Sequence, residues 1–220
     1  MAYRRTENVI RRLEARHAAI LAAAAALASE AGINAVQIAP VAERAGIAAG
    51  TVYRYFPSKT ELVAALVMDV SGREIGAMRR AADAAPGPLS ALAAALTTFA
   101  AHALQTPKLA FALIAEPVDA EIEKVRQPYR TALAGEIGKR LAVAMGGGYV
   151  PDQDITAAAP AMIGALTEGL VGPLAPGTKD DAQRRDAVQT LTLFALRAVG
   201  IADARARGLV VQARMPARAS

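Results

Sequence analysis

The chain has 220 residues, of which 54% are hydrophobic and 4% aromatic, and its formal net charge is +5. This composition excludes a disordered chain, because it supplies enough apolar surface for a sizeable core. The absence of cysteine excludes disulfides and thiolate metal sites. The first residues also lack the apolar stretch of a secretion signal, so we expect a protein of the cytoplasm.

The positive charge is concentrated at the start of the chain. Residues 1–60 carry eight basic and four acidic side chains, whereas residues 61–200 carry thirteen and fifteen. A basic end on a slightly acidic body suits contact with a polyanion such as DNA. A solvated basic terminus has the same composition, so charge alone leaves both interpretations open.

The abundance of alanine and the scarcity of alternating β-branched runs predict an all-α protein. The first helix is expected at about 13–31, where apolar residues recur at helical spacing. Gly32 follows at the place of a left-handed residue that ends a helix.

Two short helices are expected next, at about 38–45 and 49–56. Pro40 falls in the first turn of one, where a missing N–H costs nothing, and Pro57 prevents continuation of the other. Between them lies a three-residue turn that contains Gly46, followed closely by the apolar Ile47. This spacing is typical of a helix-turn-helix.

A capping box at 58–61, Ser-Lys-Thr-Glu, predicts the start of a long helix at about 59–85. Further helices are expected at about 89–105, 107–115, 119–145, 154–172 and 181–203, which makes about nine in total. We expect a helix-turn-helix domain with a basic arm at 1–60 and a second helical domain at 61–203. Residues 204–220 have no durable apolar face and are predicted to be a disordered basic tail.

The first part of this pattern resembles a known family. The segment ILAAA at 20–24, Gly32, VAERAGI at 41–47 and GTVYRYFPSK at 50–59 strongly resemble the tetracycline-repressor (TetR) family over about residues 12–66. The rest of the chain is similar only in the number and order of its helices. The resemblance implies a DNA-binding transcriptional regulator with a helical ligand-binding and dimerisation domain.

The resemblance also implies that the segment 49–55 lies in the major groove of DNA. Gly50 would let the backbone approach closely, and Arg54 is our candidate for reading guanine. Ala48 and Ala49 depart from the polar residues that the family often has there, and Gln37 replaces a Ser or Thr cap. More of the binding is therefore expected from the basic arm, which would contact a minor groove or phosphates. The arm residues are Arg4, Arg5, Arg11, Arg12 and Arg16. The predicted DNA-binding residues are Gln37, Ala49, Gly50, Thr51, Tyr53, Arg54, Tyr55 and Lys59, with Arg4 and Arg5.

For the second domain, the resemblance implies a mostly apolar cavity among the helices between 89 and 172, with no cofactor. Arg130 is a further possible polar anchor there. The last two expected helices alternate small and large apolar residues, and by resemblance they form the interface of a two-fold dimer that binds a near-palindromic operator. The predicted ligand-binding residues are Phe99, His102, Phe111, Glu116, Arg126, Tyr129, Met162 and Glu168.

We therefore interpret the sequence as a repressor that a small, largely apolar molecule releases from DNA, and not as an enzyme. An enzyme with an apolar cavity is disfavoured because no nucleophile–base pair, carboxylate pair or cofactor motif appears, and His17 and His102 lack partners for a metal site. A nonspecific architectural DNA-binding protein remains an alternative. For Tyr53 and Tyr55, packing inside the domain competes with DNA contact.

Overall fold

The computed structural model describes residues 2–216, with side chains from residue 8 onward. Within this range the chain forms ten α-helices and one short 3-10 helix and contains no strand, which confirms the predicted all-α class. The helices are α1 (Ala2–Ala31), η1 (Ile33–Ala35), α2 (Ile38–Arg44), α3 (Ala49–Tyr55), α4 (Lys59–Asp83), α5 (Pro88–Gln105), α6 (Pro107–Ile114), α7 (Ala120–Gly146), α8 (Ile155–Val171), α9 (Asp181–Ala198) and α10 (Asp203–Gln212).

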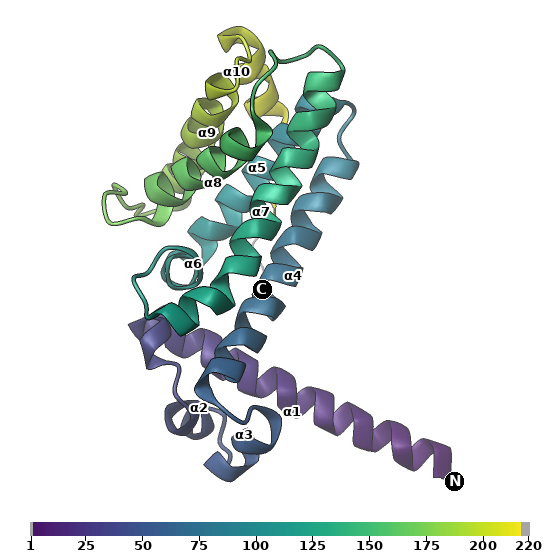
Figure 1. Cartoon of the computed structure of the whole chain (residues 1–220), viewed down its shortest axis with the longest axis vertical. Helices are drawn as coiled ribbons and strands as arrows, with labels where there is room; N and C mark the ends of the chain where they lie inside the picture. The colour runs from purple at the N-terminus through teal and green to yellow at the C-terminus, as the bar shows by residue number, and fades with distance from the viewer. Residues whose placement is uncertain (1, 217–220) are drawn as a thin grey trace.

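Helices α1, α2 and α3 gather at one end of the molecule, around the beginning of α4 (Figure 1). Their contact is apolar, because Ile20, Val41 and Val52 are fully buried and Phe56 is nearly so. Burying side chains of this size stabilises each helix by about 1.5–3 kcal/mol per residue. Helix α1 begins well before the expected residue 13, and its first half projects beyond this core (Figure 1).

Two glycines with positive φ shape this end of the molecule. Gly46 has φ +66° and ends α2, as the sequence predicts. Gly32 has φ +82° and ψ 175°, a conformation open essentially only to glycine and different from the left-handed helical one that we expected. The physical reason is that the chain leaves α1 directly into η1, for which Gly32 is the N-terminal flanking residue.

Helix α4 runs from the end formed by α1, α2 and α3 into the body, where it packs against α5 and α7 (Figure 1). Its start is capped because Ser58 Oγ accepts a hydrogen bond from the Glu61 N–H, at 3.1 Å. The proposed domain division at residue 60 therefore falls at the beginning of one continuous helix, and it stays a prediction.

A charged network joins α4 to α7. The Glu136 carboxylate is buried and accepts hydrogen bonds from Arg79 at 2.8 Å and Arg140 at 2.7 Å, and Arg140 also donates to Asp83. Burial by itself raises the pKa of Glu136, but the hydrogen bonds from Arg79 and Arg140 outweigh it and hold that pKa below its ordinary value.

Replacing Glu136 by Gln is expected to lower the free energy of unfolding by about 2 kcal/mol at pH 7. A carboxylate whose pKa is depressed by folding stabilises the protein above its unfolded pKa, about 4.3, and this contribution is lost as the pH falls through the folded pKa. The unsubstituted protein should therefore lose more stability than Glu136→Gln below about pH 4.5, as measured by urea unfolding. The exposed pair Asp69–Arg73 supplies the control, since Asp69→Asn should change little.

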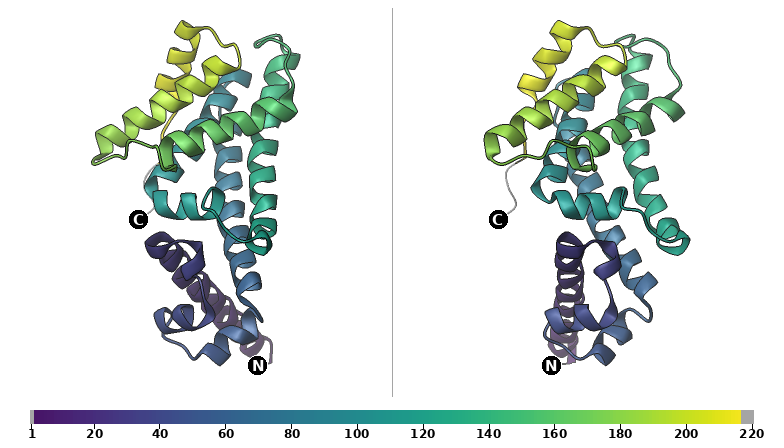
Figure 2. Two further views of the ribbon diagram at one scale, coloured as in Figure 1. Left: turned by 60° about the vertical axis from the view of Figure 1, so that its left-hand side comes forward. Right: turned by 90° about the vertical axis from the view of Figure 1, so that its left-hand side faces the viewer.

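Helix α5 is the centre of the body and packs against α4, α7, α8 and α9. Most of its residues are buried, which explains its alanine-rich sequence without a polar face. Helices α8 and α9 lie side by side along one side of the body (Figure 2). Among residues 2–216 no helix is both long and apolar enough to cross a membrane.

The predicted disordered tail is wrong for residues 204–212, which belong to α10. The predicted helix at 181–203 instead ends at Ala198, because Gly200 turns the chain with φ +88°. Helix α10 then packs on α5 and α9 through the buried side chains of Ala206, Leu209 and Val210. These three residues have the i, i+3, i+4 spacing of a short apolar face, which is the signal that could have predicted the helix. Residues 217–220 lie outside the described part.

Candidate DNA-binding surface and effector cavity

The turn between α2 and α3 has the geometry of a helix-turn-helix. The N–H of Ile47 donates to the Ala42 carbonyl at 3.0 Å, and Gly46 occupies the left-handed position between them. Ile47 packs against the core and Val52 is fully buried, so α3 is held against α2 by its inner face. The outer face of α3 is thereby left toward solvent.

Three predicted DNA-binding residues share that outer face. Gly50, Tyr53 and Arg54 are exposed, and Thr51 and Lys59 are half-buried. A Cβ atom placed on Gly50 would meet nothing within 4 Å, so the backbone at this position is open to a close approach. Ala49 is half-buried and packs against the core.

The structure separates the two tyrosines. Tyr53 keeps 53% of its surface exposed, whereas Tyr55 is half-buried and packs beside His17 and Phe56, with ring centroids 6.3 and 6.4 Å away. Tyr55 therefore contributes to packing, and Tyr53 is the tyrosine whose ring is available to a partner. A Tyr at position 55 can still present its hydroxyl at the surface.

The two residues that precede the short helices give no side-chain cap. Gln37 turns its amide back to the Asn34 carbonyl, at 3.0 Å, and Ala48 has no group that can cap. This agrees with the expectation that Gln caps poorly.

The basic arm is helical. Arg11, Arg12 and Arg16 are exposed on the first half of α1, and Arg11 donates to Asn8. A helix about 10 Å wide does not enter a B-DNA minor groove, which is about 6 Å wide. The side chains of Arg4 and Arg5 lie outside the described residues.

The eight predicted ligand-binding residues do not gather in one place. Phe99, Tyr129 and Met162 are buried core residues, and burial, with a smaller contribution from the Glu74 charge, raises the pKa of the Tyr129 hydroxyl well above its ordinary value. His102 Nδ1 lies 2.8 Å from a carboxylate oxygen of Glu74.

Glu116 lies in the turn between α6 and α7, and Arg126 lies in the second turn of α7. The guanidinium of Arg126 is 1% exposed and donates to the carbonyls of Ala112 and Glu116, at 2.9 and 2.7 Å, and to the carboxylate of Glu123. Arg130 donates to the Ile114 carbonyl at 2.7 Å and shares Glu123, at 2.6 Å. We call Glu123, Arg126 and Arg130 the arginine clamp, because it fixes the end of α6 to α7.

The Glu116 side chain reaches the end of the molecule that α1, α2 and α3 form. Its carboxylate accepts a hydrogen bond from the Ile33 N–H at 2.9 Å, and a Cβ atom at Gly32 would lie 2.5 Å from the same carboxylate. Only glycine leaves room for this contact. Glu116 and Phe111 also line a shallow cavity between α1 and α6, together with Lys108. Glu116 therefore joins the two ends of the molecule.

A cavity of about 310 Å³ lies between α6, α7 and α8, and we call it the α6–α8 cavity. Glu168 is the one predicted ligand-binding residue that lines it, and Arg130 lines it as well. The sequence analysis did not predict the other residues of its α8 wall, because their spacing along α8 is that of an ordinary core stripe. The remaining lining residues are Ile114, Ala115, Ala134, Pro160, Ile163, Gly164 and Thr167.

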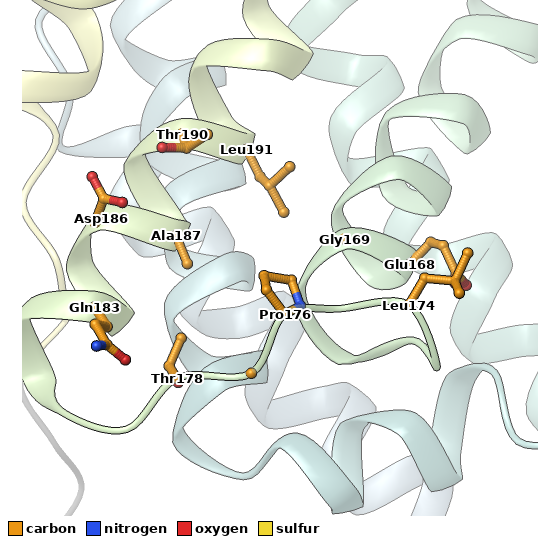
Figure 3. Close-up of a pocket in the computed structure, with 11 residues that line it drawn as sticks. Glu168, Gly169, Leu174, Pro176, Thr178, Gln183, Asp186, Ala187, Thr190 and Leu191 are labelled. Atoms are coloured by element: carbon orange, nitrogen blue, oxygen red, sulfur yellow. The ribbon is translucent and has the colours of Figure 1, made fainter.

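Glu168 also borders a second cavity, of about 470 Å³, between α8 and α9 (Figure 3). In Figure 3 Leu191 and Ala187 of α9 line one side of it, and the loop with Pro176 lies below. Leu174 in this loop is 87% exposed, so this cavity is bounded by a surface loop and not by the body.

Residues 20–66 match the model of the tetR family of bacterial regulatory proteins. The matched segment comprises the second half of α1, the helix-turn-helix of α2 and α3, and the beginning of α4. Within it, 44 residues are 61% identical to the HTH-type transcriptional repressor KstR of Rhodococcus jostii, a match that covers 20% of this chain and 21% of that repressor. The chain thus matches about a fifth of the length of this curated relative.

Solved structures show that the tetR-type fold extends over most of the chain. RolR in complex with resorcinol has a TM-score of 0.66 at 23% identity, covering 94% of this chain and 98% of that one. The regulator FadR from Bacillus subtilis in complex with stearoyl-CoA has a TM-score of 0.68 at 20% identity, covering 79% and 96%. KstR is named as a transcriptional repressor and FadR as a transcriptional regulator.

Proposed function

We propose that this protein is a cytoplasmic transcriptional repressor that binds a near-palindromic operator as a dimer and is released by a small, largely apolar molecule. The observation that carries the proposal is the outer face of α3, where Gly50, Tyr53 and Arg54 are exposed on a rigidly packed helix-turn-helix. A helix held in this way presents side chains to base edges in a major groove.

Within this proposal the roles of the surface residues follow from their chemistry. Arg54 reads a base, since its guanidinium can donate two hydrogen bonds to guanine. Thr51, Tyr53, Tyr55 and Lys59 contact phosphates, and Gln37 and Ala49 lie at the edges of the contact. The arginines of α1, including Arg4 and Arg5, add phosphate contacts that do not depend on sequence.

The dimer is proposed to form through α8 and α9. Phe194 of α9 is 55% exposed, and Ala161 and Gly164 of α8 are exposed small residues on the neighbouring helix. A large apolar side chain beside a face of small residues suits self-complementary packing across a two-fold axis. Two DNA-binding ends related by that axis would meet successive major grooves about 34–36 Å apart.

The effector is proposed to be small and largely apolar because the α6–α8 cavity has walls of Ile, Ala, Pro and Gly and a volume at the lower end of ligand sites. Two structural neighbours carry ligands of very different size, resorcinol and stearoyl-CoA, so the fold accommodates both. The volume of this cavity favours the smaller kind.

Selection of bound sequences from a random DNA pool tests the proposal, at a stated salt concentration because phosphate contacts are strongly salt-dependent. We expect an enriched inverted repeat that is bound about 10³-fold or more tightly than unrelated duplex. A pool without enrichment, with equal affinity for all duplexes, would instead support a nonspecific architectural protein. Measurement of the mass of the complex would then show how many chains bind one repeat.

A further inference from the structure

The α6–α8 cavity has two polar groups in its wall whose hydrogen-bonding capacity is not used. Thr167 is 6% exposed, and its hydroxyl has no partner in the part of the chain that the structure describes. Arg130 uses Nε and Nη1 in the arginine clamp, which leaves Nη2 without a bond among the described residues. Buried hydroxyls normally have partners, so this wall is suited to a ligand that supplies an oxygen atom.

The charges around the cavity favour a ligand with an uncharged hydroxyl over a ligand with a carboxylate. Arg130 and Glu168 are the two charged residues that line the cavity, one of each sign, and the guanidinium groups of Arg126 and Arg130 share the carboxylate of Glu123. An additional carboxylate would approach Glu168 and would lack a free countercharge. An uncharged hydroxyl can accept from Arg130 and Thr167 and donate to Glu168 without adding charge.

Arg130 also connects the cavity to the DNA-binding end. It shares the Glu123 carboxylate with Arg126, and Arg126 holds the backbone carbonyl of Glu116 at 2.7 Å. The side chain of Glu116 accepts the Ile33 N–H of η1, directly after α1. Each step is a hydrogen bond to a charged group, which is stronger than a neutral one.

The charge of Lys59, at the start of α4, also acts on the same turn. Asp119 caps the start of α7 by accepting from the N–H groups of Ile122 and Glu121, both at 3.0 Å. The bond from Ile122 is the main cause that lowers the pKa of Asp119, and the charge of Lys59 adds to it. The hydrogen bond from Ile33 to Glu116 is thus the contact that joins the α6–α7 turn to the DNA-binding end.

We propose that the α6–α8 cavity binds a small aromatic or aliphatic molecule with an uncharged hydroxyl group, which hydrogen-bonds to Arg130. Arg130 also couples ligand binding to the position of the DNA-binding end, through Glu123, Arg126 and Glu116. The ligand hydroxyl accepts from the unused Nη2 and draws the guanidinium of Arg130 into the cavity, away from Glu123 and Ile114. This weakens the arginine clamp and with it the position of Glu116 under η1. The inference rests on the proposed regulatory function, which it extends to a ligand class and a route.

The ligand class is tested with three probes of the same ring, p-cresol, p-toluate and p-xylene, by calorimetric or NMR titration of the full chain without DNA. We expect p-cresol to bind about tenfold or more tightly than the other two, because one hydrogen bond to a charged group is lost with p-xylene and a repulsion is added with p-toluate. Equal binding of p-cresol and p-xylene, or no binding of any probe at millimolar concentration, would overturn the assignment.

Two substitutions locate the site. Arg130→Met is expected to weaken p-cresol about tenfold and leave p-xylene unchanged, while the control Arg73→Met, at an exposed arginine of α4, should change neither. Thr167→Val removes a hydroxyl that has no partner, so it should weaken p-cresol while the protein keeps or gains stability. A merely structural role of Thr167 predicts the opposite pair of results. Unchanged binding of p-cresol to Arg130→Met would exclude this site.

The route is tested with a matched pair at Glu116. Glu116→Gln keeps an oxygen that accepts the Ile33 N–H, and Glu116→Ala removes it. We expect both variants to bind p-cresol like the unsubstituted chain. In Glu116→Ala, however, p-cresol should no longer change the affinity for the selected inverted repeat, whereas Glu116→Gln should keep the change. The same response in both variants overturns the route. If no repeat is selected, the regulatory proposal fails, and the titrations without DNA still decide the ligand site.

Discussion

Replacing Arg126 by Met is expected to lower the free energy of unfolding by about 3 kcal/mol, the largest effect on stability among the substitutions considered. The side chain is almost fully buried, and its removal leaves the carbonyls of Ala112 and Glu116 without their donor. A methionine fills much of the volume, so the loss reports the hydrogen bonds more than a cavity.

Urea unfolding of Arg126→Met, followed by circular dichroism, measures this loss. The control is Arg207→Met, since Arg207 forms an exposed pair with Asp203 and should contribute less than about 0.5 kcal/mol. Equal losses in the two variants would mean that the buried guanidinium is not a major source of stability. A change in the denaturant slope would instead indicate a change in the unfolded or native ensemble.

Replacing Arg54 by Ala is expected to cost about 1–3 kcal/mol of affinity for the selected operator, and to relax the preference at one base pair of each half-site. The reason is that Arg54 is exposed on the outer face of α3, and in its proposed role the guanidinium would donate two hydrogen bonds to a guanine. Stability should not change, because the side chain is exposed.

Lys59→Ala is the matched comparison for Arg54. If Lys59 contacts phosphate, its loss should weaken binding to every duplex alike and reduce the slope of log affinity against log salt by about 1. Titrations of the operator and of single-base variants at several salt concentrations separate the two roles. A uniform loss with Arg54→Ala and a base-specific loss with Lys59→Ala would reverse our assignment.

The sequence predicted best the helix bounds, which depend only on residues that are neighbours in the chain. Pro57, Gly46 and the Ser58 cap set the bounds of α2, α3 and α4 to within about two residues, because turns and caps depend on neighbours in the chain. The face of α3 that carries Tyr53 and Arg54 followed from Val52 and Phe56, which are buried on the other side.

The effector site was predictable only in part, because its residues meet through tertiary contacts. Arginine is usually a solvated residue, and nothing in the sequence around Arg126 shows that its guanidinium donates to the carbonyls of Ala112 and Glu116. Glu116 contacts Ile33, 83 residues earlier in the chain, and no local pattern predicts such a pair. Phe99 and Met162 were chosen for size, and large apolar side chains are also the ordinary filling of a core.

The continuity of α4 has a mechanical consequence. Its 25 residues form a rod about 37 Å long, with one end under α3 and the other in the body. A tilt of about 5° at the body end displaces the other end by about 3 Å, a distance comparable to the rise of one DNA base pair. In the proposed two-fold dimer both ends would be displaced. A repacking of a few degrees would therefore change the spacing of the two α3 helices so that it no longer matches the pitch of DNA.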